Sequence, residues 1–105
     1  MEQNYRIKQL EALFREFPDD PFSAYSLALE YTHTDPARAV SLFRDLLKEH
    51  PDYLPTYYHA GNLLAEEGFE DEAREVLSKG AELARLQGNA KTEKEISNAL
   101  VNLEV

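Results

Sequence analysis

The sequence predicts an all-α fold in which about six antiparallel helices stack as helical hairpins. The chain contains an internal repeat, because residues 57–64 resemble residues 24–31, and Ala60 lies 33 residues after Leu27. Apolar residues recur at spacings of three and four, which is typical of amphipathic helices, and no alternating strand pattern is present. A repeat of this length indicates hairpins that stack on their neighbours, since one hairpin cannot bury its own apolar face.

The first predicted helix covers residues 2–17 and ends at Pro18. It carries a single apolar stripe formed by Ile7, Leu10, Leu13, Phe14 and Phe17. This helix also matches the second helix of the later repeat, because Leu10 and Pro18 lie 33 residues before Phe43 and Pro51. The chain is therefore expected to begin with half a repeat.

A capping residue followed by proline opens each of the next two helices. An aspartate can accept a backbone N–H at a helix start, and proline suits the first turn. This pair occurs twice, at Asp20-Pro21 and at Asp35-Pro36. The predicted helices cover about 21–33 and 36–49, and Pro51 ends the second, because the residue before proline is pushed out of the helical region.

Glycines mark the ends of the fourth and fifth predicted helices. The fourth covers about 54–67 and closes on Gly68, which suits a left-handed C-terminal cap, and the fifth covers about 71–87 and ends at Gly88. Asn89 then caps a last helix over about 90–103. The apolar side of that helix is formed by Ile96, Ala99, Leu100 and Leu103.

Length and composition favour one soluble domain over residues 1–105, with 43% hydrophobic and 30% charged residues. The net charge of −9 argues against binding to nucleic acid or to an anionic membrane surface. No run of about 18 apolar residues is present, and residues 1–5 do not resemble a signal peptide. We therefore expect a cytoplasmic protein.

The residues that could carry chemistry do not form a recognisable site. His33, His50 and His59 fall on different predicted elements without metal-ligand spacing, and the chain has no cysteine. The four glycines form no phosphate-binding motif, and no serine stands in a nucleophile-elbow context. We expect no enzymatic activity, no metal and no cofactor.

The repeated stretches resemble the tetratricopeptide repeat, in which W-x-x-L-G-x-x-Y in one helix is followed by A-x-x-x-F and then P. The first repeat carries Ala24-x-x-Leu27-Ala28-x-x-Tyr31 with Ala39-x-x-x-Phe43, and the second carries Tyr57-x-x-Ala60-Gly61-x-x-Leu64 with Ala73-x-x-x-Leu77. The resemblance implies a right-handed α-α superhelix like that of small stand-alone bacterial members. It divides the chain into a half-repeat over 1–18, repeats over 21–51 and 54–88, and a capping helix over 89–103. Gly80 stands where the family usually has a larger residue.

In proteins of this family, the first helix of each repeat lines a concave groove that binds peptides or helices. The resemblance assigns to this groove Phe22, Tyr25, Leu29, Thr32 and His33 of the first repeat and Tyr58, Asn62, Ala65 and Glu66 of the second. Spacings of three and four place each set on a single helix face. Tyrosine and phenylalanine often contribute most of the energy of an interface. The alternative is that the tyrosines pack against a neighbouring or terminal helix.

Acidic residues gather in the two segments that the resemblance assigns to the groove. Residues 19–35 hold four acidic residues and residues 52–68 hold three, without any lysine or arginine in either segment. A solvated helix face explains part of this pattern. Such a groove should prefer apolar or basic segments of a partner, because an acidic peptide would meet repulsion.

Three functions remain open from the sequence. The first is a protein–protein interaction module that holds a helix or peptide of a partner. The second is a self-association module, in which two chains form a homodimer through the groove face or the apolar stripe of residues 2–17. The third is an enzyme, which would need a group of ligand-binding or metal-binding residues that the sequence does not show.

Overall fold

The computed structural model describes residues 2–104 of the chain, with side chains from residue 4 onward. Within this range the chain forms six helices and no strand, which confirms the predicted all-α helical repeat fold. Met1 and Val105, the ends of the domain expected over 1–105, lie outside the described residues. The chain divides into two compact units, residues 1–53 and residues 54–105.

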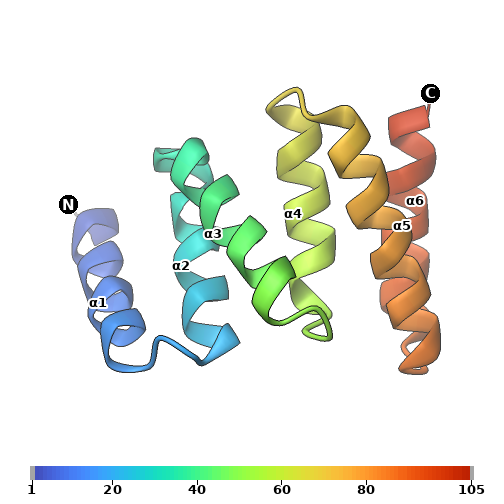
Figure 1. Ribbon diagram of the computed structural model, residues 1–105. Coiled ribbons are helices and arrows are strands. Elements are labelled where there is room, and N and C mark those ends of the chain that lie inside the picture. Colours follow the sequence, from blue (N-terminus) through green and yellow to red (C-terminus); the bar gives the residue numbers. More distant parts are fainter. Residues whose placement is uncertain (1, 105) are drawn as a thin grey trace. The chain divides into compact units, whose positions relative to one another are not determined.

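Unit 1 contains three helices (Figure 1): α1 covers Glu2–Glu16, α2 covers Pro21–Thr34 and α3 covers Pro36–Glu49. Helix α2 packs against both α1 and α3. The predicted helices at 2–17, 21–33 and 36–49 therefore agree with the structure to within one residue at each end.

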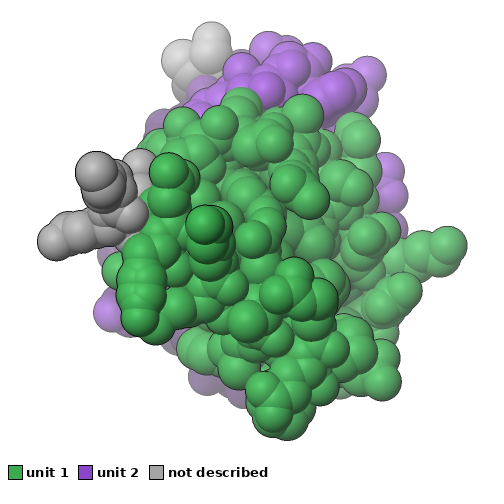
Figure 2. All heavy atoms as spheres, turned by 90° about the vertical axis from the view of Figure 1, so that its left-hand side faces the viewer, with its two compact units in different colours: residues 1–53 green, residues 54–105 purple. Residues whose placement is uncertain are grey.

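Unit 2 repeats this arrangement with α4 at Pro55–Glu66, α5 at Glu70–Leu86 and α6 at Ala90–Glu104. Helix α5 packs against both α4 and α6, and α6 also packs against α4. Figure 2 colours the atoms of unit 1 green and those of unit 2 purple.

Side-chain caps start three of the helices as the sequence predicts. Asp20 Oδ1 accepts a hydrogen bond from the backbone N–H of Phe22 at 3.0 Å at the start of α2. Asp35 Oδ1 accepts from the N–H of Arg38 at 3.3 Å, and Asn89 Oδ1 accepts from the N–H of Thr92 at 3.0 Å. Each cap provides a partner for an N–H group that has none within its own helix.

Two glycines end α4 and α5 with the same hydrogen-bond pattern. Gly68 and Gly88 have φ angles of +91° and +73°, a region that side chains disfavour. After α4, the N–H of Phe69 donates to Leu64 O at 2.8 Å and that of Gly68 donates to Ala65 O at 3.2 Å. Equivalent bonds follow α5, and both ends are Schellman motifs.

The core of unit 1 is built around α2 and α3. The buried apolar residues of these helices include small residues where they cross and large ones around them: Ala24, Leu27, Ala28, Tyr31, Ala39, Val40, Phe43 and Leu46. Helix α1 is covered less completely, since its stripe residues are half-buried at best and Phe17 remains 48% exposed. Phe17, the last residue of the apolar stripe expected from the sequence, follows the end of α1 at Glu16.

Two glycines let the helices of unit 2 approach closely. A Cβ atom on Gly61 would collide with the side chain of Leu77, so α4 and α5 cross at this point as the repeat register predicts. A Cβ atom on Gly80 would lie 2.5 Å from Tyr57 Cβ and 3.2 Å from Ile96 Cδ1. Gly80 therefore departs from the usual repeat because α4, α5 and α6 meet there.

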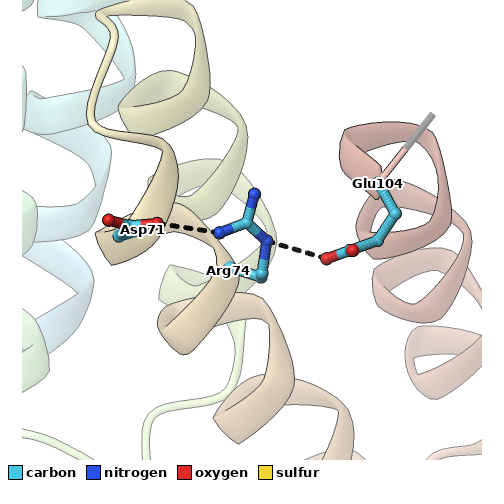
Figure 3. A network of polar contacts seen from close by, with 3 residues as sticks. All are labelled: Asp71, Arg74 and Glu104. Carbon is cyan, nitrogen blue, oxygen red and sulfur yellow. Dashed lines mark hydrogen bonds and ion pairs between the residues drawn. The ribbon is translucent and has the colours of Figure 1, made fainter.

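Helix α6 covers α5 through its apolar side. Ile96 is fully buried, whereas Ala99, Leu100 and Leu103 are half-buried. At the exposed edge, Arg74 of α5 donates to Glu104 of α6 at 2.7 Å and to Asp71 at 2.9 Å (Figure 3). This network adds a polar contact between α5 and α6 beside the apolar one.

Replacing Gly80 with alanine should destabilise unit 2, because the added methyl group would overlap Tyr57 at the crossing of α4 and α5. Overpacking of this kind lowers the free energy of unfolding by about 1–3 kcal/mol. Urea denaturation followed by circular dichroism measures the change. Ser78→Ala, at an exposed position of the same helix, is the matched control and should change stability by less than about 0.5 kcal/mol. Equal stability of Gly80→Ala and the parent chain would contradict the close approach.

Candidate partner-binding site

The residues that the sequence assigns to a binding groove fall into two sets, one in each unit. Five of them form what we call the α2 face: Phe22, Tyr25, Leu29, Thr32 and His33. Phe22 is 57% exposed and His33 is exposed, whereas the other three are half-buried. The α2 face therefore presents an accessible aromatic ring at its N-terminal end and a polar C-terminal end.

Tyr53 extends the aromatic end of the α2 face, although the sequence analysis did not single it out. Its ring stands edge-on to that of Tyr25, with centroids 5.8 Å apart and an interplanar angle of 71°. This geometry is one of the favourable arrangements for aromatic pairs. Burial raises the pKa of both hydroxyls, with a further rise from Tyr53 at Tyr25 and from Asp20 at Tyr53. Both hydroxyls therefore remain protonated at neutral pH.

The hydroxyl group of Thr32 already has a hydrogen-bond partner within α2. Its hydroxyl group donates a hydrogen bond to Ala28 O at 3.1 Å within α2. The single hydroxyl hydrogen is thus already used, which leaves the methyl group and the oxygen lone pairs. Thr32 is better suited to apolar contact than to donating a hydrogen bond.

Some of the carboxylates near α2 form an ion pair or cap a helix within unit 1. Glu30 lies 3.4 Å from the guanidinium group of Arg6 in α1. Arg6 lies outside residues 19–35, so the charge of that segment alone does not include this nearby cation. Asp20 and Asp35 cap α2 and α3, which explains their positions without a partner. Asp19 and Asp20 are both exposed and precede the aromatic end of the α2 face in the sequence.

The second set forms the α4 face of unit 2: Tyr58, Asn62, Ala65 and Glu66. The first three are half-buried and Glu66 is exposed. The Tyr58 ring stands edge-on to the ring of His59 at 5.3 Å, with an interplanar angle of 84°. The α4 face is therefore less accessible than the α2 face.

His59 stands where α4 faces α6. Burial lowers the pKa of its imidazole, and the carboxylate of Glu95 in α6 opposes this shift. Because α6 packs against α4 in this unit, part of the surface next to the α4 face is covered by the chain's own last helix. This agrees with the alternative that a terminal helix packs near the tyrosines.

No group of three or more potential metal ligands occurs among the described residues. Within the same part of the chain, no helix is both long and apolar enough to cross a bilayer.

Two three-helix units, each with a helical hairpin that carries the repeated sequence pattern, define an α-helical repeat protein. A family model for the tetratricopeptide repeat matches residues 31–92. That match covers more than half of the 105 residues, and the chain belongs to the tetratricopeptide repeat family. A search of curated proteins found no significant match.

Solved structures support the same assignment. The crystal structure of a tetratricopeptide repeat domain protein from Salinibacter ruber is 38% identical, with coverage of 81% of this chain and 96% of that one and a TM-score of 0.76. A solution structure of such a protein from the same organism is 39% identical over 83% of this chain and 89% of that one, with a TM-score of 0.77. A protein from Bordetella parapertussis shares the fold at 24% identity, with a TM-score of 0.78 over 93% of this chain and 86% of its own.

The buried position of His59 predicts a pH dependence of stability. Folding lowers its pKa from the ordinary value of 6.5, so the folded protein binds the proton less readily than the unfolded chain. The corresponding stabilisation is present above pH about 6.5 and is lost as the pH falls through the lowered pKa. The free energy of unfolding should decrease over this range, and His59→Gln should show a shallower decrease.

Denaturant unfolding at several pH values measures this slope. His33→Gln is the matched control, because His33 is exposed, and it should keep the slope of the parent chain. An unchanged slope in His59→Gln would show that the imidazole does not cause the pH dependence.

Proposed function

We propose that this chain is a non-enzymatic interaction module that holds a helix or extended segment of a partner protein against the first helix of each repeat. The tetratricopeptide repeat fold generally mediates protein–protein interaction, and this chain belongs to that family. The same proposal includes the repeat register: a half-repeat over 1–18, repeats over 21–51 and 54–88, and a capping helix over 89–103.

The observation that carries this proposal is the aromatic end of the α2 face. Phe22 is 57% exposed and lies one helical turn from Tyr25, whose ring is fixed edge-on against Tyr53. A rigid aromatic surface offers a large apolar contact area at little cost in side-chain entropy. Aromatic residues of this kind commonly contribute most of the binding energy of an interface.

The charge beside this surface favours an apolar or basic partner segment. Asp19 and Asp20 are exposed next to Phe22 in the sequence, and the carboxylate of Asp20 accepts the capping hydrogen bond of α2. An acidic rim increases the encounter rate of a basic segment, and salt screens this attraction. Nucleic acid and anionic membranes would be repelled by the net charge of −9.

Titration of the 15N-labelled protein with the capped peptide acetyl-Phe-Leu-Lys-Lys-amide tests this proposal. The amide resonances of the α2 face should shift, and the affinity should fall as salt is added. Replacing both Phe22 and Tyr25 with alanine should weaken binding about tenfold or more, since truncation of hot-spot residues typically costs ~2 kcal/mol. Helicity should remain, because neither residue belongs to the buried core.

Tyr5→Ala is the control for this experiment. Tyr5 is an exposed aromatic residue of α1 in the same unit, at 58% exposure, and its loss should leave the affinity unchanged. Undiminished binding by the Phe22/Tyr25 double variant, or tighter binding at higher salt, would place the interaction elsewhere.

A homodimer is the second candidate, and the incomplete burial of α1 favours it. Ile7, Leu10, Leu13 and Phe14 are only half-buried, and Tyr5 and Phe17 are exposed. An apolar stripe that its own chain leaves uncovered is often an interface between chains.

Sedimentation equilibrium at increasing protein concentration tests the dimer. If α1 is the interface, the mass should approach twice 12.0 kDa, and Phe17→Lys should return it to the monomer value. Leu86→Lys, at a position of α5 that is 75% exposed, should have no effect. A monomer mass at all concentrations would exclude this candidate.

A further inference from the structure

Unit 1 contains a hollowed surface on the side of α2 that packs between α1 and α3. We call it the α1–α3 valley. Its wider part is a hollow of about 310 Å³ with walls formed by Phe14 of α1 and Leu42 of α3 and a floor formed by Leu27 and Tyr31 of α2. A second hollow of about 170 Å³ shares Phe14 and Leu42 with the first, so the two lie next to each other.

The valley exists because α1 and α3 both pack against α2 and, in the part of the chain described here, not against each other. The floor residues Leu27 and Tyr31 are buried, at 4% and 5% exposure, whereas Phe14 and Leu42 are only half-buried. The walls therefore keep apolar surface that an additional side chain could cover. This surface is distinct from the α2 face, which contains none of these four residues.

Two arginines stand over the wider hollow. Arg15 belongs to the last turn of α1, and the guanidinium group of Arg38 lies 5.2 Å from the centroid of the Tyr31 ring. Both side chains are exposed, and neither forms an ion pair with any described residue. Arg6 and Arg74, in contrast, pair with carboxylates of their own chain.

The carboxylates near these arginines already have other partners. Glu11 accepts a hydrogen bond from the hydroxyl of Tyr31 at 2.5 Å. Asp35 accepts a hydrogen bond from the backbone N–H of Arg38 as the cap of α3. Burial raises the pKa of Tyr31 most, and Glu11 and Asp35 raise it further. Neither carboxylate is bonded to a guanidinium group, so the guanidinium donors of both arginines remain available, although the Glu11 carboxylate lines the same hollow.

The other end of the valley has the opposite charge. Asp45 and Glu49 of α3 line the narrower hollow, together with His50. A segment that lies along the valley would therefore meet cations at the wider end and carboxylates at the narrower end. This polarity selects one direction for the bound segment.

We propose that the α1–α3 valley binds a partner peptide in which a bulky apolar side chain is followed by carboxylates. The apolar side chain lies between Phe14 and Leu42, and a carboxylate reaches Arg15 and Arg38. Guanidinium and carboxylate groups form two parallel hydrogen bonds, which makes the contact directional as well as attractive. The preference is opposite to that of the α2 face, so one unit would bind two partner segments of unlike charge.

Titration of the 15N-labelled full chain with the capped peptide acetyl-Phe-Leu-Glu-Glu-amide tests this inference. The amide resonances of Phe14, Arg15 and Leu42 should shift, and those of the α2 face should not. Replacing both arginines with glutamine should weaken binding about tenfold or more, because hydrogen bonds to charged groups contribute ~1.5–3 kcal/mol. Arg15→Glu with Arg38→Glu should instead reverse the preference toward acetyl-Phe-Leu-Lys-Lys-amide at the valley.

Arg85→Gln is the control, because it makes the same arginine-to-glutamine change at one exposed position of α5 and should leave the affinity unchanged. Thermal unfolding of each variant checks that the fold is intact. The inference is overturned if the acidic peptide causes no shift, if the double glutamine variant binds equally well, or if the shifts map to the α2 face. A dimer mass with valley resonances already perturbed in the absence of peptide would show that a second copy occupies the valley.

The tests of the proposed function and of this inference can fail independently of each other. The acidic peptide tests Arg15 and Arg38, whereas the basic peptide tests Phe22 and Tyr25. Either surface can fail while the second still binds its own probe.

Discussion

The close approach of helices at small residues is the constraint on which each unit depends. In unit 2 the absence of a side chain at Gly61 and Gly80 lets Leu77 and Tyr57 occupy the space between α4 and α5. In unit 1 the corresponding helices bury Ala28 and Ala39 completely. Helices that cross at small residues can bury large neighbours on both sides of the contact, which a wider separation would leave partly hydrated.

Helix α2 contributes residues to two different surfaces, because it packs between α1 and α3. One side carries the aromatic residues Phe22 and Tyr25 beside acidic caps, and the other forms the floor of a valley with two arginines. Residues of the two surfaces lie close together along α2, since Tyr25 belongs to the α2 face and Leu27, two residues later, belongs to the floor of the valley. A chain with a net charge of −9 can in this way keep a local cationic site, since charges separated by more than about 8 Å are largely screened at physiological ionic strength.

Local sequence signals predicted most of the fold, whereas contacts between distant residues were predicted poorly. Aspartate-proline pairs and terminal glycines act through bonds to their own backbone, so they identify helix ends without tertiary information. The pairing of Tyr25 with Tyr53, the ion pair of Glu30 with Arg6, and the valley all join residues from separate elements. Their partners depend on side-chain geometry that no periodicity contains. Gly80 illustrates this limit of prediction from the sequence. The repeat pattern alone does not explain a glycine at this position, whereas the structure shows that Tyr57 and Ile96 occupy the space of its missing side chain.

Asp20 and Asp35 combine two roles in one carboxylate, since each starts a helix and contributes to the surface potential of unit 1. Asparagine caps a helix about as well as aspartate but carries no charge. An exchange between these two residues would therefore change the electrostatic character of the surface while the hydrogen bonds that define the helix starts are retained. At these two positions, the choice of partners can diverge among related proteins without a compensating change in the core.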